Sequence, residues 1–169
     1  MTTLKRKATQ ILTELRLLVD SIGEQDTNIN LVLASVRHRM QSGLELAGIK
    51  IIWRVNQLPN FLSFTSRDAL SLRLILMEAL SNVMHHAHAK TVTLSATYDK
   101  AVHLLAITVA DDGCGFVAPT LSEGAGLNNM QARARKLTWQ TTIHVESEPG
   151  KGTAVQIKIE PPADVGTTD

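Results

Sequence analysis

Three side chains suited to proton or phosphate chemistry recur at intervals of four: Glu78, Asn82 and His86. On a helix this spacing advances by about 40° per step, so the three form one slowly winding polar stripe. The residues around them are apolar, and a carboxylate or carboxamide is rarely placed among apolar residues unless it has a partner. The stripe therefore indicates either a functional site or the solvent-facing strip of an amphipathic helix.

A glycine-rich segment further along could bring backbone close to a ligand. An apolar run ends at Asp111, and Gly113 and Gly115 follow at alternate positions. Glycine permits close approach and positive φ, and a carboxylate at the end of a strand can accept hydrogen bonds from an exocyclic amine. Taken alone, the pattern is also that of an ordinary Asp-Gly turn.

In a second glycine-rich segment, Gly124 and Gly126 lead directly into a helical stretch that starts at Leu127. Exposed amides at a helix N-terminus, with the helix dipole behind them, form a site for phosphate. Taken singly, the segment is better explained as a flexible loop before a glycine-initiated helix. It is not a Walker A loop, because no Gly-Lys-Ser/Thr follows, and no strand directly precedes it as a dinucleotide fingerprint requires.

The segments that must position these residues alternate between helical and extended patterns. A heptad seam over residues 4–22 predicts a helix of a bundle, and a second helix is predicted over 29–46, ending before Gly48. A long helix is predicted from an N-cap at Ser66 to about His86, and another over 127–137. Strands are predicted over 49–55, 91–98, 102–110, 141–146 and 153–159.

This order predicts a helical hairpin over residues 1–47, an α+β domain over 48–160 and a loose polar tail over 161–169. Hydrophobic residues make up 44% of the chain and charged residues 20%, which excludes intrinsic disorder. A net charge of +1 argues against nucleic acid as a partner. The single Cys114 excludes an intramolecular disulfide, and the longest nearly apolar run is too short to span a bilayer.

The order of the motifs is more specific than any one of them. From Glu78 to the Pro-Gly-Lys-Gly-Thr turn at residues 149–153, it resembles the ATP-binding domain of histidine kinases, which share the Bergerat fold with gyrase B and the heat-shock chaperone ATPase. The resemblance covers residues 49–160. It implies an α+β, two-layer sandwich, in which helices cover one face of a mixed sheet, with an N-terminal helical extension.

Within that family, EALSNVMHHAHA and GAGLNNM resemble the subgroup of nitrate-sensing and membrane-fluidity-sensing kinases. Residues 13–22 resemble the second helix of that subgroup's dimerisation hairpin. The resemblance therefore implies that residues 1–47 hold a partial dimerisation helix and a linker helix, and that residues 48–160 form the ATP-binding catalytic domain.

The resemblance also implies a role for each candidate residue at the base and the phosphates. Asp111 would accept from the adenine amino group, with Gly113 and Gly115 letting base and ribose approach. Thr153 would help to hold the adenine end, through water. The lid over the phosphates would be formed by amides of the second glycine segment, those of Gly124, Gly126 and Leu127.

On the helix, the resemblance implies that Asn82 coordinates Mg²⁺ and that Glu78 is the candidate general base. His86 would lie near the phosphates, with His85 as a rival for that position. Two departures from the family pattern accompany these roles. His38 lies outside the acceptor pattern, and residues 137–139, Leu-Thr-Trp, replace the usual Gly-Gly.

The expected function is that of a sensor histidine kinase module that binds ATP and Mg²⁺. It would transfer the γ-phosphoryl group to a histidine on a dimerisation helix not present in this chain, and a response regulator would act downstream. The full-length protein is expected to be a homodimer and cytoplasmic, or the cytoplasmic part of a membrane-anchored sensor. Alternatives are an anti-sigma-factor serine kinase, a nucleotide-gated module without transfer activity and, from the histidines at 85, 86 and 88, a zinc site.

Overall fold

The computed structural model describes residues 27–55, 58–117 and 125–162. The heptad helix predicted over 4–22, the lid residue Gly124 and most of the predicted tail lie outside the described residues.

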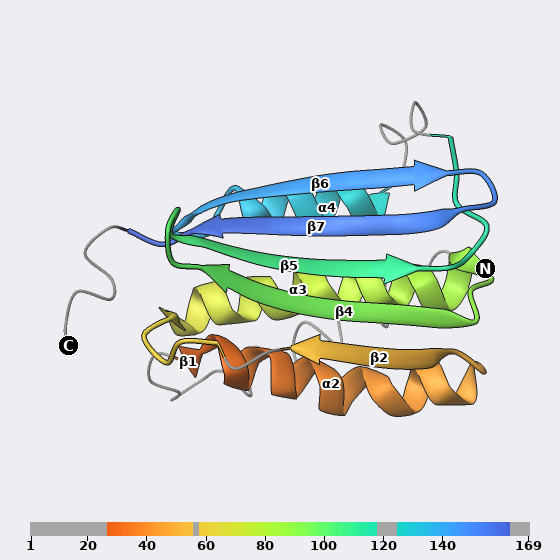
Figure 1. The fold of residues 1–169 in the computed structure, drawn as a ribbon, viewed down its shortest axis with the longest axis horizontal. Helices are drawn as coiled ribbons and strands as arrows, with labels where there is room; N and C mark the ends of the chain where they lie inside the picture. The colour runs from red at the N-terminus through yellow and green to blue at the C-terminus, as the bar shows by residue number, and fades with distance from the viewer. Residues whose placement is uncertain (1–26, 56–57, 118–124, 163–169) are drawn as a thin grey trace.

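A five-stranded mixed sheet forms one layer of the domain (Figure 1). Its strands lie in the order β2 (Lys50–Val55), β4 (Thr91–Asp99), β5 (Leu104–Asp111), β7 (Gly152–Glu160) and β6 (Gln140–Glu148). β2 pairs with β4 in parallel, and the other neighbours pair antiparallel. The predicted strands are thus confirmed, each within two residues of its expected ends.

Apolar and polar side chains alternate along the central strands, so one face of the sheet is apolar and lies in the core. Leu94, Val109 and Val155 are register partners across three strands and are all buried. Burying a Leu or Val side chain stabilises a fold by roughly 1.5–3 kcal/mol, so this face supplies much of the free energy of folding. The opposite face carries mostly small and polar side chains, as expected for a sheet that faces water on one side.

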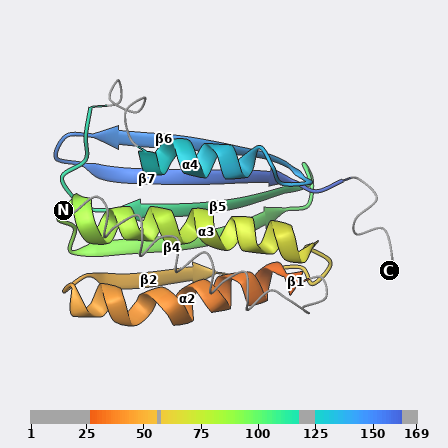
Figure 2. The same ribbon diagram turned by 180° about the vertical axis from the view of Figure 1, so that it is seen from behind.

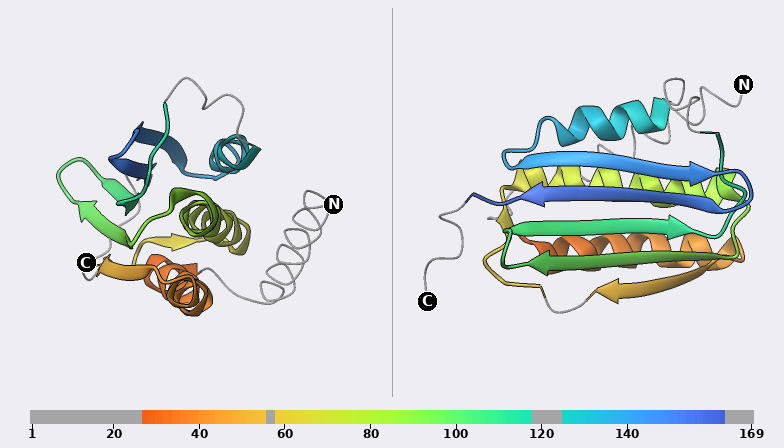
Figure 3. Two further views of the ribbon diagram at one scale, coloured as in Figure 1. Left: turned by 90° about the vertical axis from the view of Figure 1, so that its right-hand side faces the viewer. Right: turned by 45° about the horizontal axis from the view of Figure 1, so that its top comes forward.

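Within the described ranges, three helices pack on the apolar face: α2 (Ile29–Leu46), α3 (Ser66–Asn82) and α4 (Ala125–Ala134). They run side by side, with α3 between the other two (Figure 2). Viewed end-on, the sheet and the helices form two separate layers (Figure 3). The predicted α+β, two-layer sandwich is therefore confirmed.

A two-stranded sheet that was not predicted joins the beginnings of α2 and α3. β1 (Thr27–Asn28) pairs antiparallel with β3 (Ser63–Phe64), and Asn28 caps α2 by accepting from the N–H of Leu31. The predicted N-cap of α3 was wrong by one residue. Thr65, rather than Ser66, takes that position, and its hydroxyl accepts from the N–H of Asp68 over 3.1 Å.

The end of α3 changes geometry where the sequence predicted a continuous helix to about His86. The α-helix ends at Asn82 and continues as one π-helical segment, η1 (Val83–Ala87). His88 then terminates it with a φ of 51°, in the left-handed region where glycine is usual. Such π turns are rare and are frequent at functional sites.

Among the described residues, none of the helices combines the length and the apolar character needed to cross a lipid bilayer.

Candidate nucleotide site

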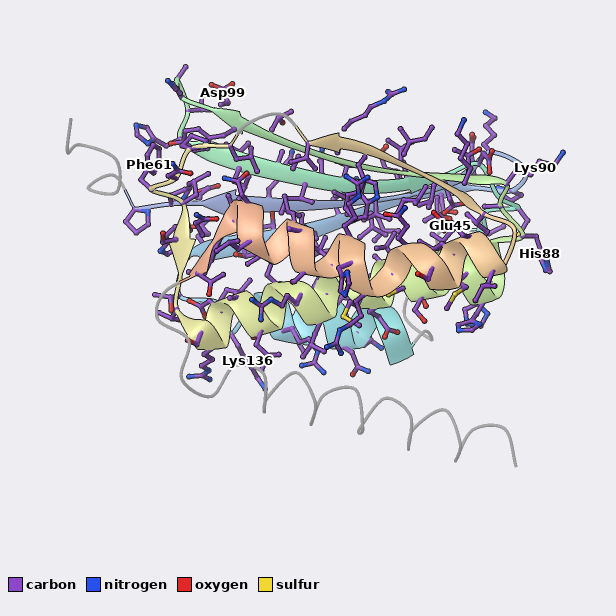
Figure 4. The ribbon with its side chains drawn as sticks, turned by 90° about the horizontal axis from the view of Figure 1, so that it is seen from below. Glu45, Phe61, His88, Lys90, Asp99 and Lys136 are labelled. Carbon is purple, nitrogen blue, oxygen red and sulfur yellow. The ribbon has the colours of Figure 1, made fainter. Side chains whose placement is uncertain are left out.

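Chain segments distant in sequence meet at one end of the domain. The end of α3, the end of β5 and the turn between β6 and β7 all lie there (Figure 1). His88 and Lys90 mark this end, and Phe61 and Asp99 mark the opposite one (Figure 4). The sequence motifs singled out above therefore lie together in space.

Asp111 lies at the end of β5, half-buried. Its carboxylate accepts from the N–H of Gly113 over 2.8 Å and from the backbone N–H of Thr153. Burial raises the pKa of Asp111, and this effect outweighs the two hydrogen bonds, which lower it. Asp111 thus joins the glycine loop to β7 and presents a partly desolvated acceptor.

Two glycines of the predicted adenine loop are required by close backbone contacts. A Cβ atom on Gly113 would overlap the carbonyl oxygen of Ala87, at the end of η1. A Cβ atom on Gly115, whose φ is 57°, would overlap the carbonyl oxygen of Glu148, at the end of β6. The loop is therefore packed between the end of the helix and the β6–β7 turn, and these contacts leave no room for side chains.

Two further residues of this region were missed by the sequence analysis. The hydroxyl of Ser147 on β6 accepts from the N–H of Phe116 over 2.9 Å and lies 2.9 Å from the hydroxyl of Thr153. Gly152, with a φ of 82°, packs against the carbonyl oxygen of Asp111. The alternation of side chains along β6 could have identified Ser147, because Ser147 faces inward like Ile143 and Val145.

Asp112 was also missed, although it lies in the motif. Its Oδ1 atom accepts from the N–H groups of Lys90 and Thr91, each over 2.8 Å. Hydrogen bonding, most strongly from the backbone of Thr91, lowers the pKa of Asp112. The exposed carboxylate therefore ties the beginning of β4 to the end of β5, beside Asp111.

Glu78 and Asn82 lie one turn apart on α3, and both are half-buried. α4 lies against them: a Cβ atom on Gly126 would overlap Oε1 of Glu78 and lie 3.5 Å from Nδ2 of Asn82. Leu127, the next residue, packs against the core. The predicted lid glycine and the two predicted α3 residues therefore form one cluster.

The donor set at this cluster suits Mg²⁺. The carboxamide oxygen of Asn82 is a hard ligand of the kind that Mg²⁺ prefers, and the Glu78 carboxylate lies one turn before it on the same helix. In the described part of the chain, His, Cys, Asp and Glu residues form no group of three that could hold a metal ion by themselves. Mg²⁺ is commonly bound by one or two protein ligands together with substrate phosphates and water, so the residues present fit this ion.

His86 and His85 lie in η1, and both are exposed. Their rings form a T-shaped pair with centroids 6.3 Å apart. His86 contacts the glycine loop through its backbone, since its carbonyl oxygen accepts from Sγ of Cys114 over 3.6 Å. The two imidazoles therefore stay rivals for the position near the phosphates.

A backbone hydrogen bond connects the segment that follows Asp111 with the segment that follows Asn82. The N–H of Cys114 donates to the carbonyl oxygen of Ala87 over 2.7 Å. The glycine loop, residues 113–115, is thereby fixed to the end of the helix that carries Glu78 and Asn82. The structure thus brings together the described residues predicted for the site, namely Glu78, Asn82, His86, Asp111, Gly113, Gly115, Gly126, Leu127 and Thr153.

Comparison with known proteins agrees with this arrangement. Residues 67–163 match the family model described as histidine kinase-, DNA gyrase B-, and HSP90-like ATPase. The sensor protein VraS of Staphylococcus aureus is 35% identical over 85 residues, which cover 50% of this chain and 23% of VraS. The chain therefore spans about a quarter of the length of that relative.

Solved structures show the same fold. The histidine kinase domain of the blue-light activated kinase of Erythrobacter litoralis EL346 superposes with a TM-score of 0.69 at 20% identity, covering 89% of this chain and 73% of that one. Full-length ShkA in complex with AMPPNP gives a TM-score of 0.63 at 21% identity, covering 96% of this chain and 38% of that one. Since the family model matches more than half of the sequence, the chain belongs to the histidine kinase-, DNA gyrase B-, and HSP90-like ATPase family.

Proposed function

We propose that this chain is the ATP-binding catalytic module of a two-component sensor histidine kinase. One observation carries the proposal: the hydrogen bond between Cys114 and Ala87 holds the Asp111 loop against the helix end that presents Asn82. This contact supports a single site in which the Asp111 carboxylate would recognise the base and the Asn82 carboxamide would bind the metal. Membership of the ATPase family and the match to VraS support the same conclusion.

The site can perform phosphoryl transfer mainly by positioning. Asp111 would accept from the adenine amino group, while the amides around Gly126 and Leu127 would contact the phosphates. Mg²⁺ held through Asn82 would neutralise phosphate charge. With these contacts the γ-phosphoryl group would lie near the end of α3, where the acceptor helix would approach it.

Glu78 would take the proton in the transfer step. The acceptor imidazole nitrogen attacks the γ-phosphorus, a P–N bond forms as the P–O bond to ADP breaks, and the displaced imidazole proton passes to the Glu78 carboxylate. Gly126 packs against that carboxylate and limits its positions. We propose Glu78 as general base on this arrangement.

We further propose that the kinase belongs to the nitrate-sensor and membrane-fluidity-sensor subgroup, on the motifs at residues 78–89 and 124–130. Its partners would be a phosphoacceptor-histidine helix, from its own full-length chain or another chain, and a downstream response regulator. A homodimer is the expected full-length state. The division at residue 47 stays a prediction.

The test is a phosphoryl-transfer assay, run on the unaltered protein and on a control variant. The protein and labelled ATP are mixed with a separate dimerisation-helix protein that carries the acceptor histidine, and acid-labile, base-stable phosphate is expected on that protein. The matched control is Glu78→Gln, which should bind ATP but transfer at least tenfold more slowly. Label on serine would instead show an anti-sigma-type kinase, and binding without transfer would show a passive nucleotide module.

A further inference from the structure

The hydroxyl group of Ser147 has three polar partners at the edge of the proposed adenine site. The N–H of Phe116 lies 2.9 Å away, the carbonyl oxygen of Gly152 3.1 Å away and the hydroxyl of Thr153 2.9 Å away. Ser147 is half-buried on β6, beside the turn that leads into β7. This hydroxyl therefore connects the glycine loop, the turn and Thr153.

Counting protons fixes the direction of each of these bonds. A serine hydroxyl has one proton to donate and two lone pairs to accept with. The amide of Phe116 can only donate and the carbonyl of Gly152 can only accept, so Ser147 donates its proton to Gly152. The remaining lone pair of Ser147 must then accept from Thr153, whose single hydroxyl proton is thereby engaged.

The direction of these bonds determines what Thr153 can offer a ligand. With its proton directed to Ser147, the Oγ1 atom of Thr153 has only lone pairs left. Asp111 is adjacent, because its carboxylate accepts from the backbone N–H of Thr153. An ionised carboxylate also offers only lone pairs, so the two side chains present hydrogen-bond acceptors alone.

We propose that Ser147 is a specificity-determining residue that makes this site select a 6-amino purine over a 6-oxo purine. An exocyclic amine has two protons, which match the acceptors of Asp111 and Thr153, directly or through water. A 6-oxo group would place its own lone pairs against them, and unpaired buried polar groups are costly. The inference rests on the proposed nucleotide-binding function and adds the residue that sets its base preference.

The inference is tested by comparing the affinities for ADP and IDP, whose bases differ in the 6-amino and 6-oxo groups. The wild-type protein should prefer ADP. Ser147→Ala releases the proton of Thr153, which can then turn toward the ligand, so the ADP-to-IDP affinity ratio should fall about tenfold. Ser147→Thr keeps a hydroxyl and should retain the preference. Thr142→Ala, which removes an exposed hydroxyl from the same strand, should leave the ratio unchanged.

The outcomes separate this inference from the proposed function. Binding of neither nucleotide by the wild-type protein would overturn the proposed site and the inference with it. A wild-type preference for ADP that persists unchanged in Ser147→Ala would overturn the inference alone. If Ser147→Ala does not fold, as judged by circular dichroism, Thr153→Val replaces it. That variant removes the acceptor at constant shape, and an unchanged ratio there would equally refute the role of this hydroxyl pair.

Discussion

Gly126 on α4 lies directly against the carboxylate of Glu78 on α3, so closely that a methyl group at Gly126 would overlap Oε1. The beginning of α4 is therefore not a separate phosphate loop beside the helix. It forms one wall of the cluster that contains Glu78 and Asn82. A side chain at residue 126 would therefore force the carboxylate end of Glu78 to move.

Gly126→Ala is expected to displace the Glu78 side chain and to reduce phosphoryl transfer by at least tenfold, measured as the rate of label transfer to the acceptor. Gly43→Ala is the matched control. Gly43 lies within α2, where a Cβ atom would meet only Sδ of Met84 at 3.6 Å. That change should stabilise the domain by roughly 0.5–1 kcal/mol and leave transfer unaffected. Equal loss of activity in both variants would contradict the argument.

Asp111 should give nucleotide affinity a characteristic pH dependence. Because burial raises its pKa, the carboxylate takes up a proton at a higher pH than an ordinary aspartate, and ADP affinity should fall as the pH decreases through that raised value. The folded domain binds this proton better than the unfolded chain does. In the absence of nucleotide, the contribution of Asp111 to the free energy of unfolding should therefore become more favourable as the pH falls through the raised pKa.

Asp111→Asn provides the comparison for this prediction. It should weaken ADP binding by roughly tenfold or more at neutral pH, since a hydrogen bond to a charged group is worth about 1.5–3 kcal/mol. It should also remove the part of the pH dependence that belongs to Asp111, leaving the titration of the nucleotide itself. Calorimetry on both proteins across the acidic range measures this difference, and identical pH profiles would rule out the assignment.

Asp112 should contribute to stability in the opposite direction with pH. Its pKa is lowered by hydrogen bonds from the backbone, so its contribution is present above the ordinary aspartate pKa and is lost as the pH falls through the lowered value. Asp112→Ala should lower the melting temperature at neutral pH and weaken ADP binding, because the beginning of β4 is no longer held to β5. Asp112→Asn keeps an acceptor oxygen and should lose less. Thermal unfolding at neutral and acidic pH distinguishes the two.

Asn82→Ala is expected to abolish the dependence of ATP binding on Mg²⁺, since it removes the carboxamide oxygen assigned to the ion. Asn60→Ala is the control, because Asn60 is an exposed carboxamide that precedes Phe61 in sequence, and Phe61 lies at the opposite end of the domain (Figure 4). Titration of ATP with and without Mg²⁺ measures the effect. Retention of full metal dependence in Asn82→Ala would exclude this ligand role.

The sequence predicted the helices and strands well because their signals were local, whereas the two-layer arrangement was implied by the resemblance to the ATP-binding domain of histidine kinases. Alternating apolar residues in β4 and β5 and the spacing of apolar residues in α3 report directly on which face is buried. The pairing of β1 with β3 was missed, since each strand has two residues and no periodicity can be seen over that length. At the beginning of α3, Thr65 and Ser66 are both good N-cap residues, so composition could not choose between them.

The residues of the candidate site were less predictable than the helices and strands. The types and order of Asp111, Asn82 and Gly126 marked them as candidates, although their roles stay predictions. Asp112 could not be assigned from sequence, and Ser147 could be recognised only as an inward-facing position of β6, because the importance of both depends on partners brought near by folding. Asp112 needs the amides at the beginning of β4, and Ser147 needs the glycine loop and the turn before β7.

The π-helical turn at the end of α3 also limits which insertions and deletions the chain can accept. Deleting or inserting one residue in η1 would rotate the following residues by about 100° and carry the carbonyl of Ala87 away from the amide of Cys114. The number of residues in this turn, more than the identity of its exposed side chains, keeps the helix aligned with the adenine loop. Homologues that conserve this alignment should therefore differ here by replacement and not by length.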